Sequence, residues 1–395
     1  MSADQAPAIA PGHARYALGV LFAINLFNYV DRQILSGVLP LVQKDLALSD
    51  AALGSLASAF MILYLAASVP LGILGDRVPR QRLIAVGVGV WSLATLVSGL
   101  ARSYGQLFVA RSVVGIGEAS YGPTATAMVS DLFPRARRGL VNGIFNAAIP
   151  LGGAVGVILG GLVGTAFGWR AAFLLVGLPS LALTALAWRL GDPQRGAHDG
   201  LGAAAGTGAT GVVDSVLTLF RTPTFVMVCA VGMLVAFAIG AFNHWLPLYL
   251  HRVKHLSIPE ASFWFGVLSA TGGLVGVIAG GLIGDALARR TPAGHLITIG
   301  AGFLLAAPAG LVMMLAPGRA VFLPSLFLSV ASLVLYIGSV NAVIHNVVHP
   351  ALRATAMAIF AFIVNLGGAA LSPALVGLIS DRRQSLQTAM LMLPA

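Results

Sequence analysis

The stretch "GILGDRVPRQR" (72–82) decides the fold, because it ends an apolar run with a glycine, an aspartate and several arginines. A related stretch, "GGLIGDALARR" (280–290), ends another apolar run about half a chain length later. Repeats at half-chain spacing indicate duplication of a helical unit in membrane transporters. The chain is therefore expected to consist of two related halves.

The composition is that of an integral membrane protein, with 58% hydrophobic and only 9% charged residues among 395. The net charge of +10 comes from arginines scattered between apolar runs, which is not the continuous basic face that binds nucleic acid. The single cysteine, Cys229, excludes an intrachain disulfide and a cysteine-rich metal site. The sequence has no metal-ligand cluster, catalytic nucleophile or nucleotide-binding loop, so we expect neither an enzyme nor a cofactor.

Apolar runs of about twenty residues, the length that crosses a bilayer, recur between short polar breaks. Eleven membrane helices are predicted, over residues 16–39, 52–73, 82–101, 105–130, 138–166, 170–190, 222–249, 260–287, 294–315, 321–347 and 352–380.

A segment rich in glycine and small residues, 192–221, follows the sixth helix and is expected to be a cytoplasmic linker between two bundles, 1–191 and 222–395. The last stretch, "DRRQSLQTAMLMLPA" (381–395), is too short for another crossing. Either a twelfth helix lies outside this sequence or the number of helices is odd. The expected fold is all-α, with two six-helix bundles of which the second has its twelfth helix missing or truncated.

The distribution of basic residues predicts the topology. If the N-terminus is cytoplasmic, more than half of the 23 lysines and arginines fall on the cytoplasmic side. Cytoplasmic loops of membrane proteins carry such an excess. We therefore expect a multi-pass protein of the plasma (inner) membrane with a cytoplasmic N-terminus.

Two glycine ladders, each with a glycine at every fourth residue, occur in the fifth and eighth predicted helices. They are Gly152, Gly156, Gly160 and Gly164, and Gly272, Gly276, Gly280 and Gly284. Because small residues let membrane helices approach closely, we expect these two helices to touch along the ladders, where the halves could slide. Packing inside a static bundle is the alternative.

The stretch at 72–82 resembles the loop between helices two and three of the major facilitator superfamily, and 280–290 resembles its weaker counterpart. The resemblance implies that Asp76 helps to latch the cytoplasmic side shut while the transporter faces outward. Asp76 could accept hydrogen bonds at the start of the eleventh helix, near 351–354, and pair with Arg138. A loop that only orients the protein is the alternative. The expected cytoplasmic gate comprises Asp76, Arg77, Arg80, Arg138 and Arg353.

Four charged residues lie inside predicted membrane helices, Asp31 and Arg32 in the first and Arg111 and Glu118 in the fourth. Ionised groups there are costly unless they are paired or hydrated. Asp31 and Arg32 point about 100° apart, and Arg111 and Glu118 lie about 10 Å apart along one stripe, so each needs a partner elsewhere.

Two positive and two negative groups that exchange partners could couple helix movement to proton binding, because burial raises the pKa of a carboxyl group and a nearby guanidinium lowers it. We expect Glu118 to carry the proton under the control of Arg111 or Arg32. A structural network that joins the first and fourth helices is the alternative.

Three stretches, "NYVDR" (28–32), "GDR" (75–77) and "RSVVGIGEASYGPTATAMVSDLF" (111–133), resemble the spinster branch of the superfamily, and the resemblance is strongest over 25–170. It implies transport of lysophospholipids or sphingosine phosphate, and it implies Asp31, Arg32, Arg111 and Glu118 as the coupling residues.

Polar and aromatic residues within the apolar runs are candidates for the substrate cavity, although such residues more often pack or bind carbonyl groups. They are Asn25, Asn28, Phe60, Tyr64, Tyr121, Asn142, Asn146, Asn243, His244, Trp245, Asn341 and His345.

The leading interpretation is a monomeric, proton-coupled secondary transporter that moves an amphipathic lipid through the membrane by alternating access. The alternative within transport is a proton-linked carrier of small organic anions or drugs, and convergent arginines in the second half, which the sequence lacks, would favour an anion. A membrane scaffold or sensor that transports nothing is a third interpretation.

Overall fold

The computed structural model describes residues 11–194, 212–349 and 352–394, and the regular elements in those ranges are helices. The first half contains α1 (Pro11–Leu46), α2 (Asp50–Arg77), α3 (Arg80–Leu100), α4 (Tyr104–Ala119), α5 (Gly122–Leu132), α6 (Arg135–Phe167) and α7 (Trp169–Trp188). The second half contains α8 (Val212–Phe220), α9 (Pro223–Arg252), α10 (Ile258–Ala288), α11 (Gly294–Leu315), α12 (Arg319–Val334), α13 (Tyr336–Val347), α14 (Arg353–Ile363), η2 (Val364–Ala369), α15 (Ser372–Arg383) and α16 (Leu386–Met390).

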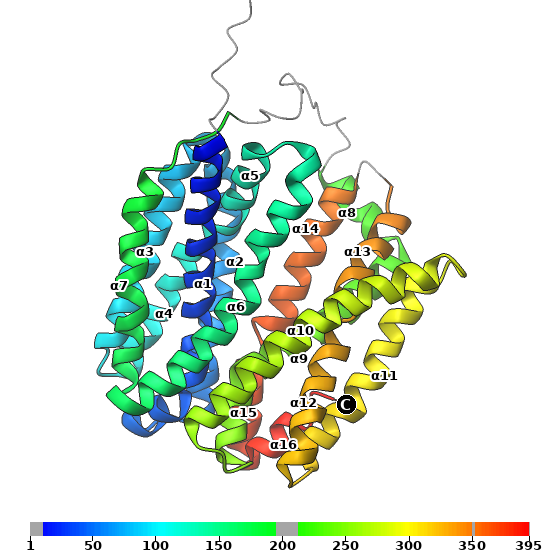
Figure 1. Ribbon diagram of the computed structural model, residues 1–395. Coiled ribbons are helices and arrows are strands. Elements are labelled where there is room, and N and C mark those ends of the chain that lie inside the picture. Colours follow the sequence, from blue (N-terminus) through cyan, green and yellow to red (C-terminus); the bar gives the residue numbers. More distant parts are fainter. Residues whose placement is uncertain (1–10, 195–211, 350–351, 395) are drawn as a thin grey trace, which may run out of the picture.

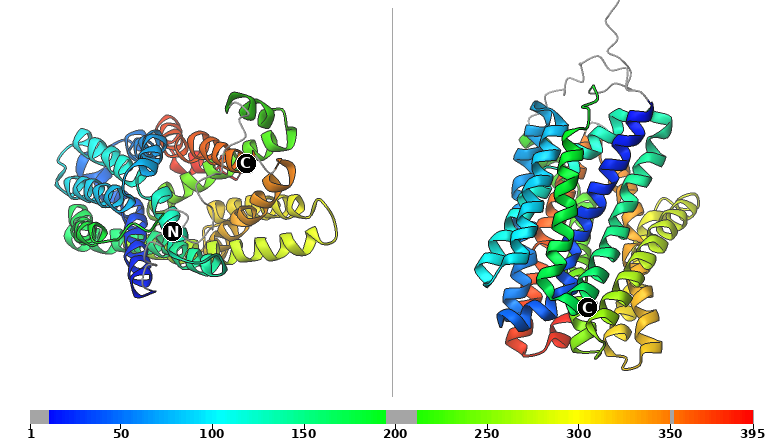
Figure 2. Two further views of the ribbon diagram at one scale, coloured as in Figure 1. Left: turned by 90° about the horizontal axis from the view of Figure 1, so that it is seen from above. Right: turned by 60° about the vertical axis from the view of Figure 1, so that its left-hand side comes forward.

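The helices form two bundles that stand side by side, α1 to α7 in one and α9 to α16 in the other (Figures 1 and 2). We call the end where α1 begins and α7 ends the linker end. The other end, with the α1–α2, α3–α4, α9–α10 and α11–α12 connections, is called the opposite end (Figure 1). In the part of the chain that the structure describes, each of the eleven predicted membrane helices is present as one helix or as an interrupted helix.

Three predicted helices are interrupted, which the sequence interpretation did not anticipate. The helix expected over 105–130 breaks at Ser120 and Tyr121. Pro123 contributes to this break, because proline has no N–H and its ring clashes with the carbonyl group four residues earlier. The helix over 321–347 divides at Leu335, and the helix over 352–380 contains the π-helical turn η2 before Pro373.

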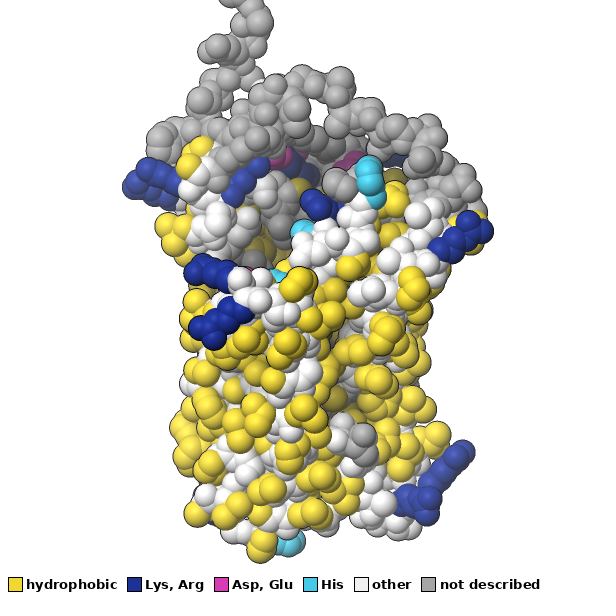
Figure 3. Space-filling model, turned by 90° about the vertical axis from the view of Figure 1, so that its right-hand side faces the viewer, with side chains coloured by type: hydrophobic (Ala, Val, Ile, Leu, Met, Phe, Trp, Pro, Cys, Tyr) yellow, Lys and Arg dark blue, Asp and Glu magenta, His cyan; other side chains and the backbone are white. Residues whose placement is uncertain are grey.

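Nine helical segments among the described residues are long and apolar enough to cross a membrane. The α1 helix and the α4–α5 pair are not among them, and these are the elements that carry the four charged residues. Large apolar side chains are exposed along the sides of the molecule, as on α10 and α11, and Figure 3 shows an apolar flank with basic residues toward its two ends. This surface suits a surrounding bilayer.

The glycine ladders do not form the contact between the halves, contrary to expectation. A side chain at Gly156 would collide with Val30 of α1, and one at Gly276 would collide with Ala331 of α12. The α6 and α10 helices do touch, but at Gly161 beside Ser262. Each ladder therefore packs α6 or α10 against a helix of its own half. A stripe of glycines allows close packing with any neighbouring helix, and the topology decides which helix that is.

The segments after the sixth and eleventh crossings differ from simple linkers. The end of the expected 192–221 linker forms α8, which packs on α9 and α14, while 195–211 lie outside the described residues. After α15 the short helix α16 packs against α15 and α9. In the first half α7 packs against α1 and α3. In the second half a cavity of about 410 Å³ lies between α9 and α11.

Candidate functional site

The four charged side chains of α1 and α4 form two ion pairs. Arg32 Nε donates to Glu118 Oε2 at 2.6 Å, and Arg111 Nη1 donates to Asp31 Oδ1 at 3.0 Å. The prediction that Asp31 and Arg32 turn to different neighbours is confirmed. Since each pair joins α1 to α4, breaking either one frees part of the contact between these helices.

The Asp31–Arg111 pair is closed on all sides, with the two side chains only 1% and 2% exposed. Thr95 of α3 donates to Asp31 Oδ2 at 2.6 Å, so both carboxylate oxygens have a donor. Arg111 also reaches the backbone oxygen of Asp31 at 3.4 Å. Thr95 was not predicted, because a threonine in an apolar helix is unremarkable in the sequence. This pair has the properties of a fixed joint between α1, α3 and α4.

The Arg32–Glu118 pair is incomplete. The Glu118 side chain is 0% exposed, and its Oε1 atom has no hydrogen-bond partner among the described residues. A buried carboxylate oxygen without a donor is unfavourable, and a proton bound there would remove the charge. Arg32 is 18% exposed and therefore reaches the edge of the buried region. The Asp31 carboxylate differs, because each of its oxygens has a donor.

An aromatic cage surrounds the Arg32 guanidinium. Its central carbon lies 5.1 Å from the ring centre of Tyr29, 5.3 Å from that of Phe60 and 4.7 Å from that of Tyr64. The ring centre of the buried Phe60 also lies 5.7 Å from the central guanidinium carbon of Arg111, so this ring contacts both arginines. Cation–π attraction adds to the ion pair with Glu118 in holding the guanidinium of Arg32 at this position.

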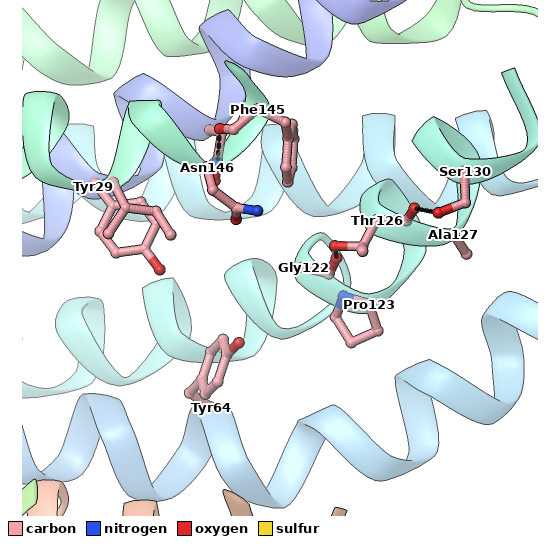
Figure 4. A pocket seen from close by; sticks show the side chains of 11 residues that line it. Tyr29, Tyr64, Gly122, Pro123, Thr126, Ala127, Ser130, Phe145 and Asn146 are labelled. Atoms are coloured by element: carbon pink, nitrogen blue, oxygen red, sulfur yellow. Dashed lines mark hydrogen bonds between the residues drawn. The ribbon is translucent and has the colours of Figure 1, made fainter. Parts of the chain in front are cut away.

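A cavity of about 600 Å³ lies between α1, α2, α5 and α6, on the linker-end side of the ion pairs. Figure 4 shows Tyr29, Tyr64 and Asn146 pointing into it, with Thr126 and Ser130 on its α5 side. The Asn25 amide, which also borders the cavity, donates to the Phe145 carbonyl at 2.9 Å. Among the predicted cavity residues Asn25, Tyr64 and Asn146 line this space. Tyr29 was quoted in a motif but was not selected.

Two predicted cavity residues are buried and hydrogen-bonded to neighbouring helices. Tyr121 is buried, donates its hydroxyl to the Leu21 carbonyl and packs edge-on against Trp91. Trp245 is buried and donates to the Pro373 carbonyl at 3.0 Å, which ties α9 to α15. Buried donors must find acceptors, and here carbonyl groups of neighbouring helices supply them.

The other predicted residues do not border the 600 Å³ cavity. Asn28 and His244 are buried, Asn142 and Asn243 are half-buried, and Asn341 and His345 are exposed on α13.

Arg80 of the expected gate is an anchor within the first half. The buried side chain donates to Asp131 at 2.6 Å and to Asp192 at 2.8 Å, and it also binds the Pro193 carbonyl. A buried guanidinium requires several acceptors, and these all come from α5 and the chain after α7. These contacts of Arg80 all lie within the first half.

The remaining gate residues lie at the linker end. Asp76 and Arg77 are exposed in the last turn of α2, and Arg353 begins α14. Arg138 Nε donates to the Phe133 carbonyl at 3.3 Å. The expected partner region at 351–354 falls partly on residues 350–351, which lie outside the described residues.

Comparisons with known proteins agree with this architecture. The family model of the Major Facilitator Superfamily matches residues 21–372. Protein spinster of Drosophila melanogaster is 31% identical over 93% of this chain, which spans only 62% of that relative. Sphingosine-1-phosphate transporter SPNS2 of Danio rerio is 31% identical over 93% of this chain and 76% of its own.

A crystal structure of a bacterial homolog to the human lysosomal transporter Spinster, in an inward-facing and unoccupied conformation, matches with a TM-score of 0.85. It is 25% identical and the match covers 98% of this chain and 89% of that one. The match confirms the predicted fold of two helical bundles. The chain is a membrane transporter that belongs to the spinster branch of the major facilitator superfamily.

Proposed function

We propose that this protein is a proton-coupled secondary transporter that moves a lysophospholipid or a sphingosine-phosphate-like lipid by alternating access. Glu118 binds the proton, and Arg32 responds to its charge. Asp31 and Arg111 hold α1 and α4 in register while this happens. The protein works as a monomer, with membrane lipids and protons as its partners.

The arrangement of Glu118 carries this proposal. Its carboxylate is buried, has one oxygen without a partner, and is held by an arginine that lies against Tyr29 and Tyr64, two residues that line the cavity. When Glu118 is ionised, it attracts Arg32 into the aromatic cage. When Glu118 is neutral, the attraction weakens and Arg32 is available to a substrate anion in the neighbouring cavity. Proton binding and substrate binding are thereby linked through one arginine.

The shape and chemistry of the cavity support an amphipathic substrate. Hydroxyl and amide groups from Tyr29, Tyr64 and Asn146 line one part, whereas Ala127 and Ile149 contribute apolar surface. The polar residues could bind the headgroup of a lipid, and the apolar residues could contact its acyl tail. The name of the zebrafish relative, a sphingosine-1-phosphate transporter, points to the same class of molecule.

The topology proposal places the linker end in the cytoplasm and the protein in the plasma (inner) membrane. Exposed Arg189 lies at the linker end and exposed Arg102 at the opposite end. In a Cys229→Ser background, an impermeant maleimide applied to intact cells should label Arg102→Cys and spare Arg189→Cys. Labelling of Arg189→Cys alone would reverse the proposed orientation.

The decisive experiment uses purified protein in liposomes with an imposed pH gradient and a radiolabelled lysophospholipid or sphingosine 1-phosphate. Glu118→Gln keeps the shape of the side chain and an acceptor for Arg32 but cannot bind and release a proton. Glu260→Gln is the matched control, because Glu260 is exposed and pairs with Arg319 on the surface at 3.3 Å. We expect the gradient to accelerate lipid flux in the original protein and in the control, but not in Glu118→Gln.

The other outcomes separate the competing interpretations. Equal gradient dependence in Glu118→Gln would make this ion pair structural. Gradient-driven flux of organic anions or drugs without lipid flux would replace the lipid substrate. Absence of flux for all three classes of solute would favour a membrane scaffold or sensor.

A further inference from the structure

A groove of about 710 Å³ runs between α3 and α4 on the outside of the first half. Its α3 wall contains Val90, Leu93 and Val97, and its α4 wall contains Val109 and Val113. Both helices pack on other helices of the first half, and Figure 2 shows them on the side that faces away from the second half. This space, which we call the α3–α4 groove, is therefore separate from the 600 Å³ cavity near Glu118.

The α3–α4 groove faces the bilayer. Leu93, Val97 and Val109 are each more than half exposed, which suits side chains that contact hydrocarbon. The α4 side of the groove extends from Gln106 to Val113, about 10 Å along the helix axis. Half of a hydrocarbon core is about 15 Å thick. An acyl chain of the leaflet at the opposite end could therefore lie along the whole groove.

The floor of the groove is held in place from behind. It contains Ala94 and Ala110, which are buried. The residues that follow them in the chain, Thr95 and Arg111, both donate to the Asp31 carboxylate. Through these two bonds α1 holds α3 and α4 together. A groove that is already formed loses little conformational entropy when a ligand binds.

The mouth of the groove is polar and lies beside a positive charge. Gly105 and Gln106 line the groove next to the α3–α4 connection, and a Cβ at Gly105 would have no atom within 4 Å. Gln106 Oε1 accepts from the backbone amide of Arg102 at 2.8 Å, which leaves the Nε2 group of Gln106 as a donor. The exposed Arg102 takes part in none of the ion pairs among the described residues.

This order of groups matches the order of groups in a phospholipid. A cation at the membrane surface, a hydrogen-bond donor below it and apolar walls further in correspond to a phosphate, an ester carbonyl and an acyl chain. The chain from 80 to 117, which forms both walls and their connection, contains no aspartate or glutamate that would repel a phosphate. The volume lies within the roughly 300–1,000 Å³ of small-molecule sites. A helix from a second copy could cover the apolar walls, but it would not require the arginine.

We propose that the α3–α4 groove binds an anionic phospholipid from the leaflet at the opposite end. One acyl chain lies between Val97 and Val109, and the phosphate group pairs with Arg102. The lipid is a bound partner of the first half and not the transported molecule. The proposal depends neither on the identity of the substrate nor on proton coupling.

The test uses photoreactive lipids and purified protein in nanodiscs of phosphatidylcholine. A small fraction of the lipid is phosphatidylglycerol or, in a parallel sample, phosphatidylcholine, with a diazirine in one acyl chain. After irradiation, mass spectrometry of peptides measures the labelling of the groove relative to the labelling of α11 around Leu304, which is 78% exposed on the other half. This ratio corrects for the lipid contact that every bilayer-facing surface makes.

Four variants test the two parts of the site. Arg102→Gln removes the charge but keeps the backbone amide that binds Gln106. Its control is Arg319→Gln, an exposed arginine at the same end of the other half. Gly105→Phe fills the mouth, and Gly105→Ala is its control, because it makes the same change to the backbone but leaves the mouth open. Residues 102 and 105 are exposed, so all four variants should melt like the original protein.

We expect phosphatidylglycerol to label the groove about fivefold more strongly than phosphatidylcholine in the original protein, the factor expected for one arginine beside an anionic headgroup. Arg102→Gln should abolish this preference. Gly105→Phe should lower the labelling of the groove by both lipids. Gly105→Ala and Arg319→Gln should behave like the original protein.

Three results would overturn the proposal. They are equal labelling of the groove by the two lipids in the original protein, a preference that survives Arg102→Gln, and a loss of labelling in Gly105→Ala as large as in Gly105→Phe. A stable dimer in native mass spectrometry, with the groove labelled by neither lipid, would instead assign this surface to a second copy of the chain. Because no transport is measured, failure of the lipid substrate or proton assignment leaves this test intact.

Discussion

Neutralising Asp31 should destabilise the protein far more than neutralising an exposed aspartate of the same helix. In Asp31→Asn the guanidinium of Arg111 keeps its charge, its burial and its place beside Phe173, but loses the carboxylate at 3.0 Å. Thr95 loses a charged acceptor at 2.6 Å as well. An unpaired cation is then left in a region where its side chain is only 2% exposed.

The magnitude follows from the surroundings of the two pairs. Removing one partner of a buried ion pair costs about 3–5 kcal/mol, because the other charge stays desolvated. The Asp45–Arg170 pair at the end of α1 has side chains 46% and 38% exposed, so Asp45→Asn should cost about 0–1 kcal/mol. Asp31→Asn/Arg111→Gln should recover much of the loss, since neutral groups replace both ions.

Thermal unfolding of the detergent-solubilised protein, followed by size-exclusion chromatography, ranks these variants. The expected order of melting temperatures is original, Asp45→Asn, the double variant and then Asp31→Asn. If Asp31→Asn melted with Asp45→Asn, the pair would not be a fixed joint. If the double variant were no more stable than Asp31→Asn, the loss would not come from the unpaired cation.

Two further predictions use the same melting assay. Gly156→Val should destabilise by about 1–3 kcal/mol or more, because its side chain overlaps α1, whereas Gly153→Ala has only one atom near, at 3.8 Å, and should be neutral; equal melting temperatures would contradict the α1–α6 contact. Arg80→Gln should cost about 3–5 kcal/mol by leaving two carboxylates without their arginine, while exposed Arg82→Gln should have little effect; equal melting temperatures of these two variants would contradict the role of Arg80 as a buried anchor.

The crossings could be predicted from the sequence because apolar length is a direct requirement of the bilayer. The interruptions could not, because proline alone does not decide them. Pro40, Pro70 and Pro150 lie inside continuous helices, whereas Pro123 and Pro373 follow breaks. Proline leaves the carbonyl group four residues earlier without its donor in the helix. Whether the helix continues depends on whether neighbouring helices allow this carbonyl group to find another partner.

The charged residues of the site could be predicted for the same reason that makes them costly in a membrane. Which of these charged residues pair with each other depends on how each helix is rotated and how deep it lies. A local sequence pattern specifies neither. Thr95 and Tyr29 were missed because both residue types are ordinary in membrane helices. Two contacts between the halves were also missed: Arg252 donates to the Asp50 carboxylate, and the Asp50 amide donates to Asp381. Charges at helix ends are common, and these three residues are far apart in the chain.

The glycine ladders show a different kind of limit. Spacing by four residues correctly predicts a smooth stripe on α6 and on α10. It does not say which helix the stripe faces, and both stripes face their own half. Packing inside each half, which was the alternative, is what the contacts of Gly156 and Gly276 support.

The most direct test of the central claim measures proton movement caused by the lipid itself. Liposomes carrying a pH-sensitive dye and purified protein receive sphingosine 1-phosphate or a lysophospholipid at equal pH on both sides. We predict a pH change inside the liposomes for the original protein and for Glu260→Gln, and none for Glu118→Gln, which should still exchange labelled for unlabelled lipid. A pH change of the same size in Glu118→Gln would contradict the assignment of Glu118 as the proton carrier.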